Sequence, residues 1–140
     1  MFQLLWYPTT TADRSLPSFI QNANAPVLNT DVSTAFLTWY LADLDISDPA
    51  SLPATLAPAN AVSLAGLPPA FIGTADYDPL RDDGAKYAEK LSAAGVPVTL
   101  SNEPTMVHGY VSFALASPAA SEAANRGLEA LKKALHPASE

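Results

Sequence analysis

The sequence predicts an α/β fold around a parallel sheet, and two patterns carry this prediction. In the second half of the chain, strand-like and helix-like segments alternate, which is typical of βα units with parallel strands and helices on the sheet faces. Near the N-terminus, the run Phe2–Trp6 is apolar on both faces, as a strand inside a parallel sheet would be. Such a strand pairs on both sides, so we expect its neighbours on one side to be missing from this chain.

The clearest strand–helix unit lies in the middle of the chain. Ala70–Ala75 is a continuous apolar run, and Pro68-Pro69 before it favours an extended entry. Apolar residues then recur with helical spacing, and Gly95 is a good C-terminal stop. We therefore expect a buried strand, a carboxylate-bearing turn and a helix that opens at Pro79.

A second strand–helix unit follows directly. The alternation within Val96–Glu103 predicts a strand, which Pro104 ends. Ala119–Leu135 is the closing helix, and lysines at its C-terminal end suit the helix dipole. His136 is interpreted as a solvated residue at this helix end. One stripe of the helix is expected to face the core: Ala120, Ala124, Leu128, Leu131 and Leu135.

Proline-punctuated connections dominate the first half of the chain. Thr9–Thr30 has no convincing periodicity and is interpreted as loop, whereas Asp31–Ala42 has the spacing of a helix. Asp43–Gly66 is a further connection. Four apolar residues are expected to anchor it: Leu52, Leu56, Val62 and Leu64. The helix carries apolar residues on one face, which could pack in the core or cover a substrate pocket: Val32, Phe36, Trp39 and Tyr40.

Composition excludes several classes of protein. The chain has 140 residues, enough for one domain with a core, and its net charge of −7 argues against nucleic acid and anionic membrane as partners. It has no cysteine, so a disulfide, a thiolate nucleophile and a cysteine metal site are excluded. No apolar run approaches the ~18 residues of a membrane span. The N-terminus also lacks the features of a signal peptide, so we expect a cytoplasmic protein.

Two residues that could carry chemistry follow neighbouring strands. Asp78 comes after the first strand, and His108 comes after the second, 30 positions later. Parallel strands end on the same edge, about 4.8 Å apart, so a carboxylate–imidazole hydrogen bond is geometrically easy. Such a carboxylate fixes the histidine tautomer and leaves the other ring nitrogen free to take a proton from a nucleophile. The alternatives are a helix cap at Asp78 and a surface histidine at His108.

A family resemblance rests on these same segments. Its motifs are Leu-Pro-Pro-Ala-Phe-Ile-Gly-Thr-Ala-Asp-Tyr-Asp-Pro-Leu-Arg-Asp-Asp-Gly from Leu67, then Ala-Gly-Val-Pro-Val, and then His-Gly-Tyr. With Tyr7-Pro8 they closely resemble the C-terminal half of α/β-hydrolases of the hormone-sensitive-lipase-like esterase family. The resemblance covers nearly the whole chain and is most specific over Leu67–Phe113. It implies the last three parallel strands of an α/β-hydrolase sheet with flanking helices, the N-terminal half being absent.

The resemblance also implies roles for single residues. Asp78 matches the triad acid of a Ser-His-Asp mechanism, and His108 matches the triad base. The family's enzymes cleave carboxylic esters, often of short acyl chains, and they need no cofactor and no metal. The segment Thr9–Ala42 matches a cap-side region. On this basis we expect the following substrate-pocket residues: Tyr7, Pro8, Phe36, Tyr40, Gly109 and Tyr110.

We expect one partial α/β-hydrolase domain over residues 1–140. Residues 9–66 would form the cap-side and pocket connection with one helix. Residues 67–136 would form the strand–helix–strand–helix part that carries the triad acid and base.

The chain departs from the family pattern at the nucleophile. The Gly-x-Ser-x-Gly elbow and the His-Gly-Gly-Gly oxyanion motif are both absent, and in family order both precede Phe2–Trp6. Asp76 adds a second carboxylate two residues before Asp78, which leaves the choice of triad acid open between them. We expect the chain to be inactive alone. Its partners would be a small ester substrate in the full-length enzyme, and a missing N-terminal half or a second copy paired through an exposed sheet edge.

Two other functions remain as alternatives. Asp76-Tyr77-Asp78 after an apolar strand resembles the Asp-x-Asp of haloacid-dehalogenase-like phosphatases, where the pair holds magnesium and one Asp is a nucleophile. The chain could instead be a truncated or split hydrolase without catalytic activity, which only folds, associates or complements a missing half.

Overall fold

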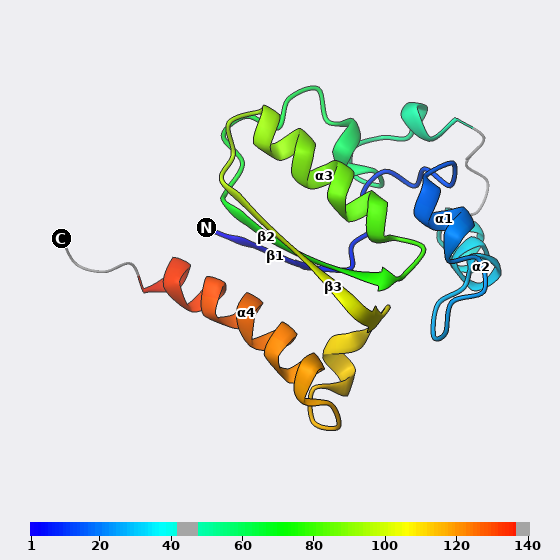
Figure 1. Ribbon diagram of the computed structural model, residues 1–140. Coiled ribbons are helices and arrows are strands. Elements are labelled where there is room, and N and C mark those ends of the chain that lie inside the picture. The colour runs from blue at the N-terminus through cyan, green and yellow to red at the C-terminus, as the bar shows by residue number, and fades with distance from the viewer. Residues whose placement is uncertain (42–47, 137–140) are drawn as a thin grey trace.

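The computed structural model describes residues 1–41 and 48–136 and contains a parallel sheet with helices on both faces (Figure 1). Its strands are β1 (Gln3–Trp6), β2 (Ala70–Tyr77) and β3 (Val98–Val107), in the spatial order β1-β2-β3. Its α-helices are α1 (Pro17–Gln21), α2 (Thr30–Leu41), α3 (Arg81–Ala93) and α4 (Pro118–Leu135). Its 3-10 helices are η1 (Pro49–Ser51), η2 (Pro58–Asn60) and η3 (Tyr110–Phe113). The predicted parallel sheet is confirmed.

The central strand β2 separates two apolar layers. Alternate residues of a strand point to opposite faces, so Ala70 and Ile72 face α3 while Phe71 and Ala75 face α4. On the α3 side these residues join a core cluster that includes Tyr87, Ala88 and Leu91. Because both faces of β2 are covered, its near-continuous apolar sequence is the pattern of a central parallel strand.

The helix α4 covers the opposite face near the N-terminal strand. Its buried residues are small, and they include Ala120, Ala123 and Gly127. The Trp6 ring of β1 lies across this layer and packs edge-to-face against Phe71, with ring centroids 5.5 Å apart. The predicted stripe is therefore right for its first half only, since the side chains near the C-terminal end of α4 are exposed, with Leu128 52% and Leu135 63% exposed.

The strand β3 runs further than its proline suggests. It continues through Pro104 to Val107, so the prediction that Pro104 ends the strand is wrong. The register between β2 and β3 shifts between Ala75 and Tyr77, which marks a bulge or irregularity. A proline removes one ladder donor, and an edge strand with an irregular ladder tolerates this loss.

The first half of the chain contains a helix that periodicity missed. Within the segment interpreted as loop, α1 forms five residues with Pro17 in its first turn and buries Ser18 and Phe19. The helix α2 confirms the helix predicted from Asp31, whereas the predicted end at Ala42 lies outside the described residues. Its aromatic face is not packed in the core, because Trp39 and the residues beside it are largely exposed.

The connection before β2 is anchored in part as predicted. Leu52 and Leu64 are buried, and Leu56 is half-buried. Val62 is fully exposed, so the prediction that it anchors the connection is wrong. The 3-10 turn that ends at Asn60 carries the chain past this position, with Ala59 as the buried residue instead.

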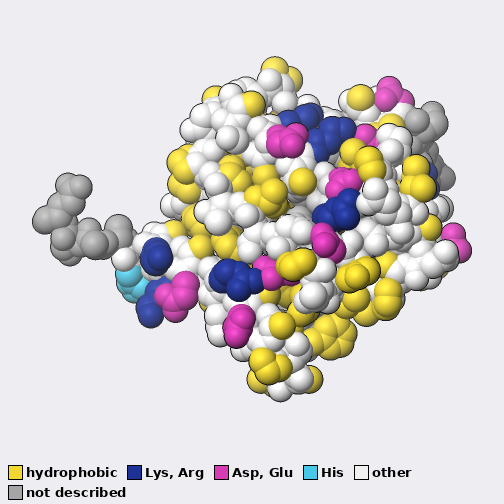
Figure 2. Space-filling model, viewed as in Figure 1, with side chains coloured by type: hydrophobic (Ala, Val, Ile, Leu, Met, Phe, Trp, Pro, Cys, Tyr) yellow, Lys and Arg dark blue, Asp and Glu magenta, His cyan; other side chains and the backbone are white. Residues whose placement is uncertain are grey.

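Apolar side chains remain on the surface of the described residues. Figure 2 shows hydrophobic side chains gathered over the carboxyl end of β3 and the turn after it, where Phe113 and Leu115 are exposed. No helix in the described part of the chain is long and apolar enough to cross a membrane. The strand β1 pairs with β2 and is half-exposed along its length.

The contact between Gly127 and Trp6 yields a stability prediction. A Cβ at Gly127 would overlap the Trp6 ring and lie 3.0 Å from Leu4 Cδ1. Gly127→Ala should therefore lower the free energy of unfolding by about 1–3 kcal/mol through overpacking, although alanine favours a helix by about 1 kcal/mol over glycine. Urea unfolding measures this change. The control is Asn125→Ala on the exposed side of α4, which should be neutral or stabilising. A stabilised Gly127→Ala protein would contradict the packing described here.

Candidate active site

The carboxyl ends of β2 and β3 bring an aspartate and a histidine together. Asp78 directly follows β2, and His108 directly follows β3. The distance between His108 Nδ1 and Asp78 Oδ2 is 2.8 Å, while Asp78 Oδ1 accepts a hydrogen bond of 2.8 Å from the Leu80 N–H. The Asp78 side chain is fully buried and that of His108 is 23% exposed. The carboxylate thus holds one ring nitrogen, and Nε2 is left for a second partner.

The His108 ring is also held by its neighbours. The Tyr7 ring lies at 4.6 Å from it, centroid to centroid, in a tilted arrangement. Burial raises the pKa of the Tyr7 hydroxyl, and the negative charge of Asp78 raises it further. Tyr7 adopts φ +39°, and Gly109 adopts the left-handed φ +76° that lets the chain turn directly after the histidine. These contacts fix both the plane of the ring and the backbone beside it.

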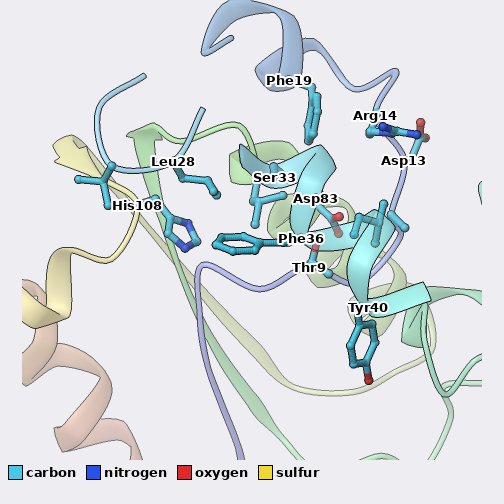
Figure 3. A pocket seen from close by; sticks show the side chains of 14 residues that line it. Thr9, Asp13, Arg14, Phe19, Leu28, Ser33, Phe36, Tyr40, Asp83 and His108 are labelled. Carbon is cyan, nitrogen blue, oxygen red and sulfur yellow. The ribbon is translucent and has the colours of Figure 1, made fainter. Parts of the chain in front are cut away.

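A cavity of about 400 Å³ opens beside His108. Its wall is mainly apolar and comes from α1, α2 and the segment between them, with Phe19, Leu28 and Phe36 as large side chains. Figure 3 shows the Phe36 ring between the His108 imidazole and the Asp83 carboxylate. An apolar cavity with a polar reactive group at its wall is typical of a site for a small organic ligand.

The expected pocket residues lie at different places in the structure. Phe36 and Tyr40 do line the cavity, although their side chains are 56% and 75% exposed overall. Tyr7 lies against the histidine ring, and Gly109 lies beside the cavity residue Val27.

Two of the expected residues lie elsewhere. Pro8 packs beside Gly84 at the start of α3 rather than in the wall. Tyr110 is fully buried beneath Trp6 and Tyr7, so its assignment to the pocket is corrected to the core. Its hydroxyl is buried without a hydrogen-bond partner among the described residues, and burial followed by the Glu103 charge raises the pKa of this hydroxyl.

Sequence reasoning missed most of the cavity wall. The missed residues lie largely in the segment interpreted as loop: Thr9, Ala12, Asp13, Arg14, Phe19, Val27 and Leu28. Such a segment has no period that would identify the inward side chains. The available signals were the family resemblance of Thr9–Ala42 to a cap-side region and Pro17, which is favoured in the first turn of a helix.

Asp83 is a further cavity residue that was not predicted, and its carboxylate holds the segment after β1 in place. Its Oδ1 accepts hydrogen bonds from the Thr10 N–H at 2.9 Å, the Thr11 N–H at 3.0 Å and the Thr10 hydroxyl. Burial raises the pKa of the Asp83 carboxyl, although the hydrogen bonds from Thr10 and Thr11 oppose this shift. The carboxylate therefore ties the chain after β1 to the first turn of α3.

The arrangement of carboxylates does not resemble a magnesium site. Both oxygens of Asp78 already have partners, and Asp76 Oδ1 accepts a hydrogen bond of 2.7 Å from the Asn102 side chain. The described residues contain no group of three or more side chains that could hold a metal ion. The geometry instead supports proton transfer through a histidine that a buried carboxylate orients.

The comparisons with known proteins agree with this geometry. Residues 1–112 match the family described as alpha/beta hydrolase fold. The chain belongs to this family. The chain is 72% identical over 136 residues to carboxylesterase NlhH of Mycobacterium tuberculosis, and the match covers 97% of the chain and 42% of that relative. It is 55% identical over 136 residues to esterase LipI of the same organism, again with 42% of the relative covered.

A solved structure gives the same result. The chain superposes on the crystal structure of DphMB1 with a TM-score of 0.90 at 55% identity, covering 95% of this chain and 43% of that one. The chain thus spans about 42% of the length of the curated relatives it matches. The family match confirms the predicted fold class and gives no support to the phosphatase alternative.

The buried Asp83 carboxylate predicts a pH-dependent stability. Because folding raises its pKa, the folded chain holds the proton more tightly, so this group's contribution is most favourable at acidic pH and falls as pH rises through the raised pKa. Asp83→Asn keeps an acceptor oxygen and removes the charge. It should therefore be at least as stable as the parent at neutral pH, with a gain that shrinks toward acidic pH.

The matched variant is Asp83→Ala, which leaves the Thr10 and Thr11 N–H groups without their acceptor. It should lose about 2–4 kcal/mol of unfolding free energy at every pH. Urea unfolding over a pH series measures both variants. An Asp83→Asn protein that is as unstable as Asp83→Ala would show that the charge itself holds the loop.

Proposed function

We propose that this chain is the C-terminal part of a carboxylic-ester hydrolase and supplies its triad acid and base. The observation that carries the proposal is the buried Asp78 carboxylate, 2.8 Å from His108 Nδ1 at the edge of a parallel sheet and beside an apolar cavity. Relatives named carboxylesterase and esterase, at 72% and 55% identity, support the same activity.

In the proposed mechanism a serine of the missing part attacks the ester carbonyl carbon. His108 Nε2 takes the serine proton as the new C–O bond forms, and Asp78 stabilises the imidazolium. The imidazolium then gives this proton to the alcohol oxygen as the ester C–O bond breaks, which leaves an acyl-enzyme. Water, activated by the same histidine, hydrolyses the acyl-enzyme. The oxyanion donors also come from the missing part, since the chain lacks both motifs.

The two segments of the chain have separate roles in this proposal. Residues 9–66 form the cap-side connection, of which the segment from Thr9 to Tyr40 lines the substrate pocket, and residues 67–136 carry Asp78 and His108. A cavity of about 400 Å³ with mainly apolar walls suits a small ester with a short apolar acyl or alcohol group. Phe36 and Tyr40 of α2 would contact that group, which favours the pocket interpretation of their helix face over the core interpretation.

A fragment without activity of its own is the second candidate. The observation that favours it is the absence of a serine between glycines at the elbow spacing. On this view the chain folds only with, or complements, a separately supplied N-terminal half. The two candidates share one structural requirement, namely a partner at the outer side of β1.

The proposed function predicts restored activity in a chimera. We join the part of carboxylesterase NlhH that lies outside the matched region to this chain, since 72% identity should preserve their interface. The chimera should hydrolyse a p-nitrophenyl ester of a short acid, and the chain alone should not. Asp78→Asn in the chimera should lower kcat on the order of 10³- to 10⁴-fold, because the histidine is left in the wrong tautomer. His108→Ala should cost a similar factor.

The matched control is Asp76→Asn, which removes the other carboxylate of the same turn and should cost less than about 10-fold, the scale of a residue outside the proton path. Equal or reversed losses at the two aspartates would overturn the choice of Asp78. Saturable hydrolysis by the chain alone, abolished by His108→Ala, would show that the chain needs no missing half.

The sheet edge predicts association. The outer side of β1 presents backbone groups without a strand partner among the described residues, in a run without charge or proline. Such an edge pairs readily with another chain, and apolar patches beside it add to the tendency. The chain alone should therefore self-associate, and the added NlhH part should convert it to a one-to-one complex. Size-exclusion chromatography with light scattering measures both states. A compact monomer that unfolds cooperatively and does not bind the added part would show that β1 needs no strand partner on its outer side.

A further inference from the structure

The turn that carries Asp78 is held by two side chains from a distant segment. Asn22 Nδ2 donates hydrogen bonds to the backbone carbonyl of Asp76 at 2.9 Å and to that of Asp78 at 3.1 Å. Ser18 Oγ donates to the carbonyl of Pro79 at 2.7 Å. Both side chains are buried. Three carbonyls of this turn therefore accept hydrogen bonds from the helix α1 and the residue after it, and the Asp78 carbonyl also accepts one from the Arg81 N–H at 3.1 Å.

The sheet ladder is irregular at this turn, although Tyr77 still pairs with Val107. The register between β2 and β3 shifts between Ala75 and Tyr77, so the regular ladder is interrupted next to Asp76. Pro79 has no backbone N–H, so the chain offers no hydrogen-bond donor directly after Asp78. Buried carbonyls need hydrogen-bond partners, and Asn22 supplies one to Asp76 and a second one to Asp78 beside the Arg81 N–H.

The helix α1 is in turn bound rigidly to α3. The Ser18 N–H donates to Asp82 Oδ2 at 2.9 Å, and the Asp82 N–H donates to Ser18 Oγ at 3.1 Å. The two helix starts thus cap each other reciprocally. Phe19 packs against Leu28 and Leu80 in a small core cluster of its own. These contacts leave Asn22 little freedom to follow a displaced turn.

From these contacts we infer that Asn22 is a positioning residue for the Asp78–His108 pair. Its amide fixes the backbone on both sides of Tyr77, and this backbone sets the distance from Asp78 Oδ2 to His108 Nδ1. The inference rests on the proposed function, since it assigns Asn22 a role in that reaction. Only a side chain with two donors on one atom can hold both carbonyls, which asparagine offers and serine or aspartate does not.

The chain contains a matched control for this residue. Asn60 Nδ2 also donates to two backbone carbonyls, those of Pro49 at 2.7 Å and Leu52 at 3.1 Å. Asn60 does not line the cavity and belongs to the connection before β2. Truncation at either asparagine removes the same kind and number of hydrogen bonds, but only one of them adjoins the acid.

The experiment compares Asn22→Ala and Asn22→Ser with Asn60→Ala and Asn60→Ser in the chimera. Asn22→Ala should lower kcat by about 10- to 100-fold with little change in KM, the loss expected when a reacting group is displaced by about 1 Å. Asn22→Ser keeps one donor and should fall between Asn22→Ala and the parent. The Asn60 variants should lower the melting temperature by a similar amount and leave kcat within about 2-fold.

A second readout does not depend on turnover. In the parent, the proton on His108 Nδ1 should give a low-field NMR resonance, because it is held by a buried carboxylate. This resonance should broaden or move upfield in the Asn22 variants and stay in place in the Asn60 variants. If Asn22→Ser leaves both kcat and the resonance at parent values, the asparagine only stabilises the fold and the inference is overturned. A parent chimera without esterase activity would overturn the proposed function instead, and the resonance would still decide the role of Asn22.

Discussion

The buried carboxylate of Asp78 is the constraint on which the rest of the site depends. A charged group in the interior is tolerated only when hydrogen bonds or an opposite charge replace the water it has lost. Here the Leu80 N–H donates a hydrogen bond to one oxygen, and Nδ1 of the His108 ring forms a hydrogen bond with the other. The histidine is available because β2 and β3 are parallel neighbours that end at the same edge, whereas the Leu80 N–H lies only two residues along the chain. A slip of one residue in their register would turn these side chains to the other face of the sheet.

The acidic residues after Asp78 have a similar inward role. Asp82 and Asp83 lie in the first turn of α3, where the helix dipole favours negative charge and where acidic side chains are commonly exposed to solvent. Instead Asp83 holds the Thr10–Thr11 backbone, and Asp82 holds α1. One helix start thus gathers Asp78, the cavity wall and the segment that carries Asn22.

The sequence predicted the parts of this structure that follow from period and strand order. The three strands, the helices α2, α3 and α4 and the meeting of Asp78 with His108 all depend on such patterns. The five-residue helix α1 could not be predicted, because it is shorter than two turns and is stabilised by side chains more than fifty positions away. The wall of the cavity was missed for the same reason. Tyr110 was misplaced because its position after His108 says nothing about which way its ring turns.

The exposed apolar surfaces and the incomplete chemistry point to the same missing partner. Only 15% of the residues are charged, yet Phe36, Trp39, Tyr40 and Leu128 are more than half exposed. Of these residues, Phe36 and Tyr40 line the cavity, whereas Leu128 lies on α4. A second body that pairs with β1 would extend the sheet, and the proposal requires the same body to bring a serine to His108 Nε2. The proposal therefore assigns the missing strand and the nucleophile to one partner, which pairs with the outer edge of β1.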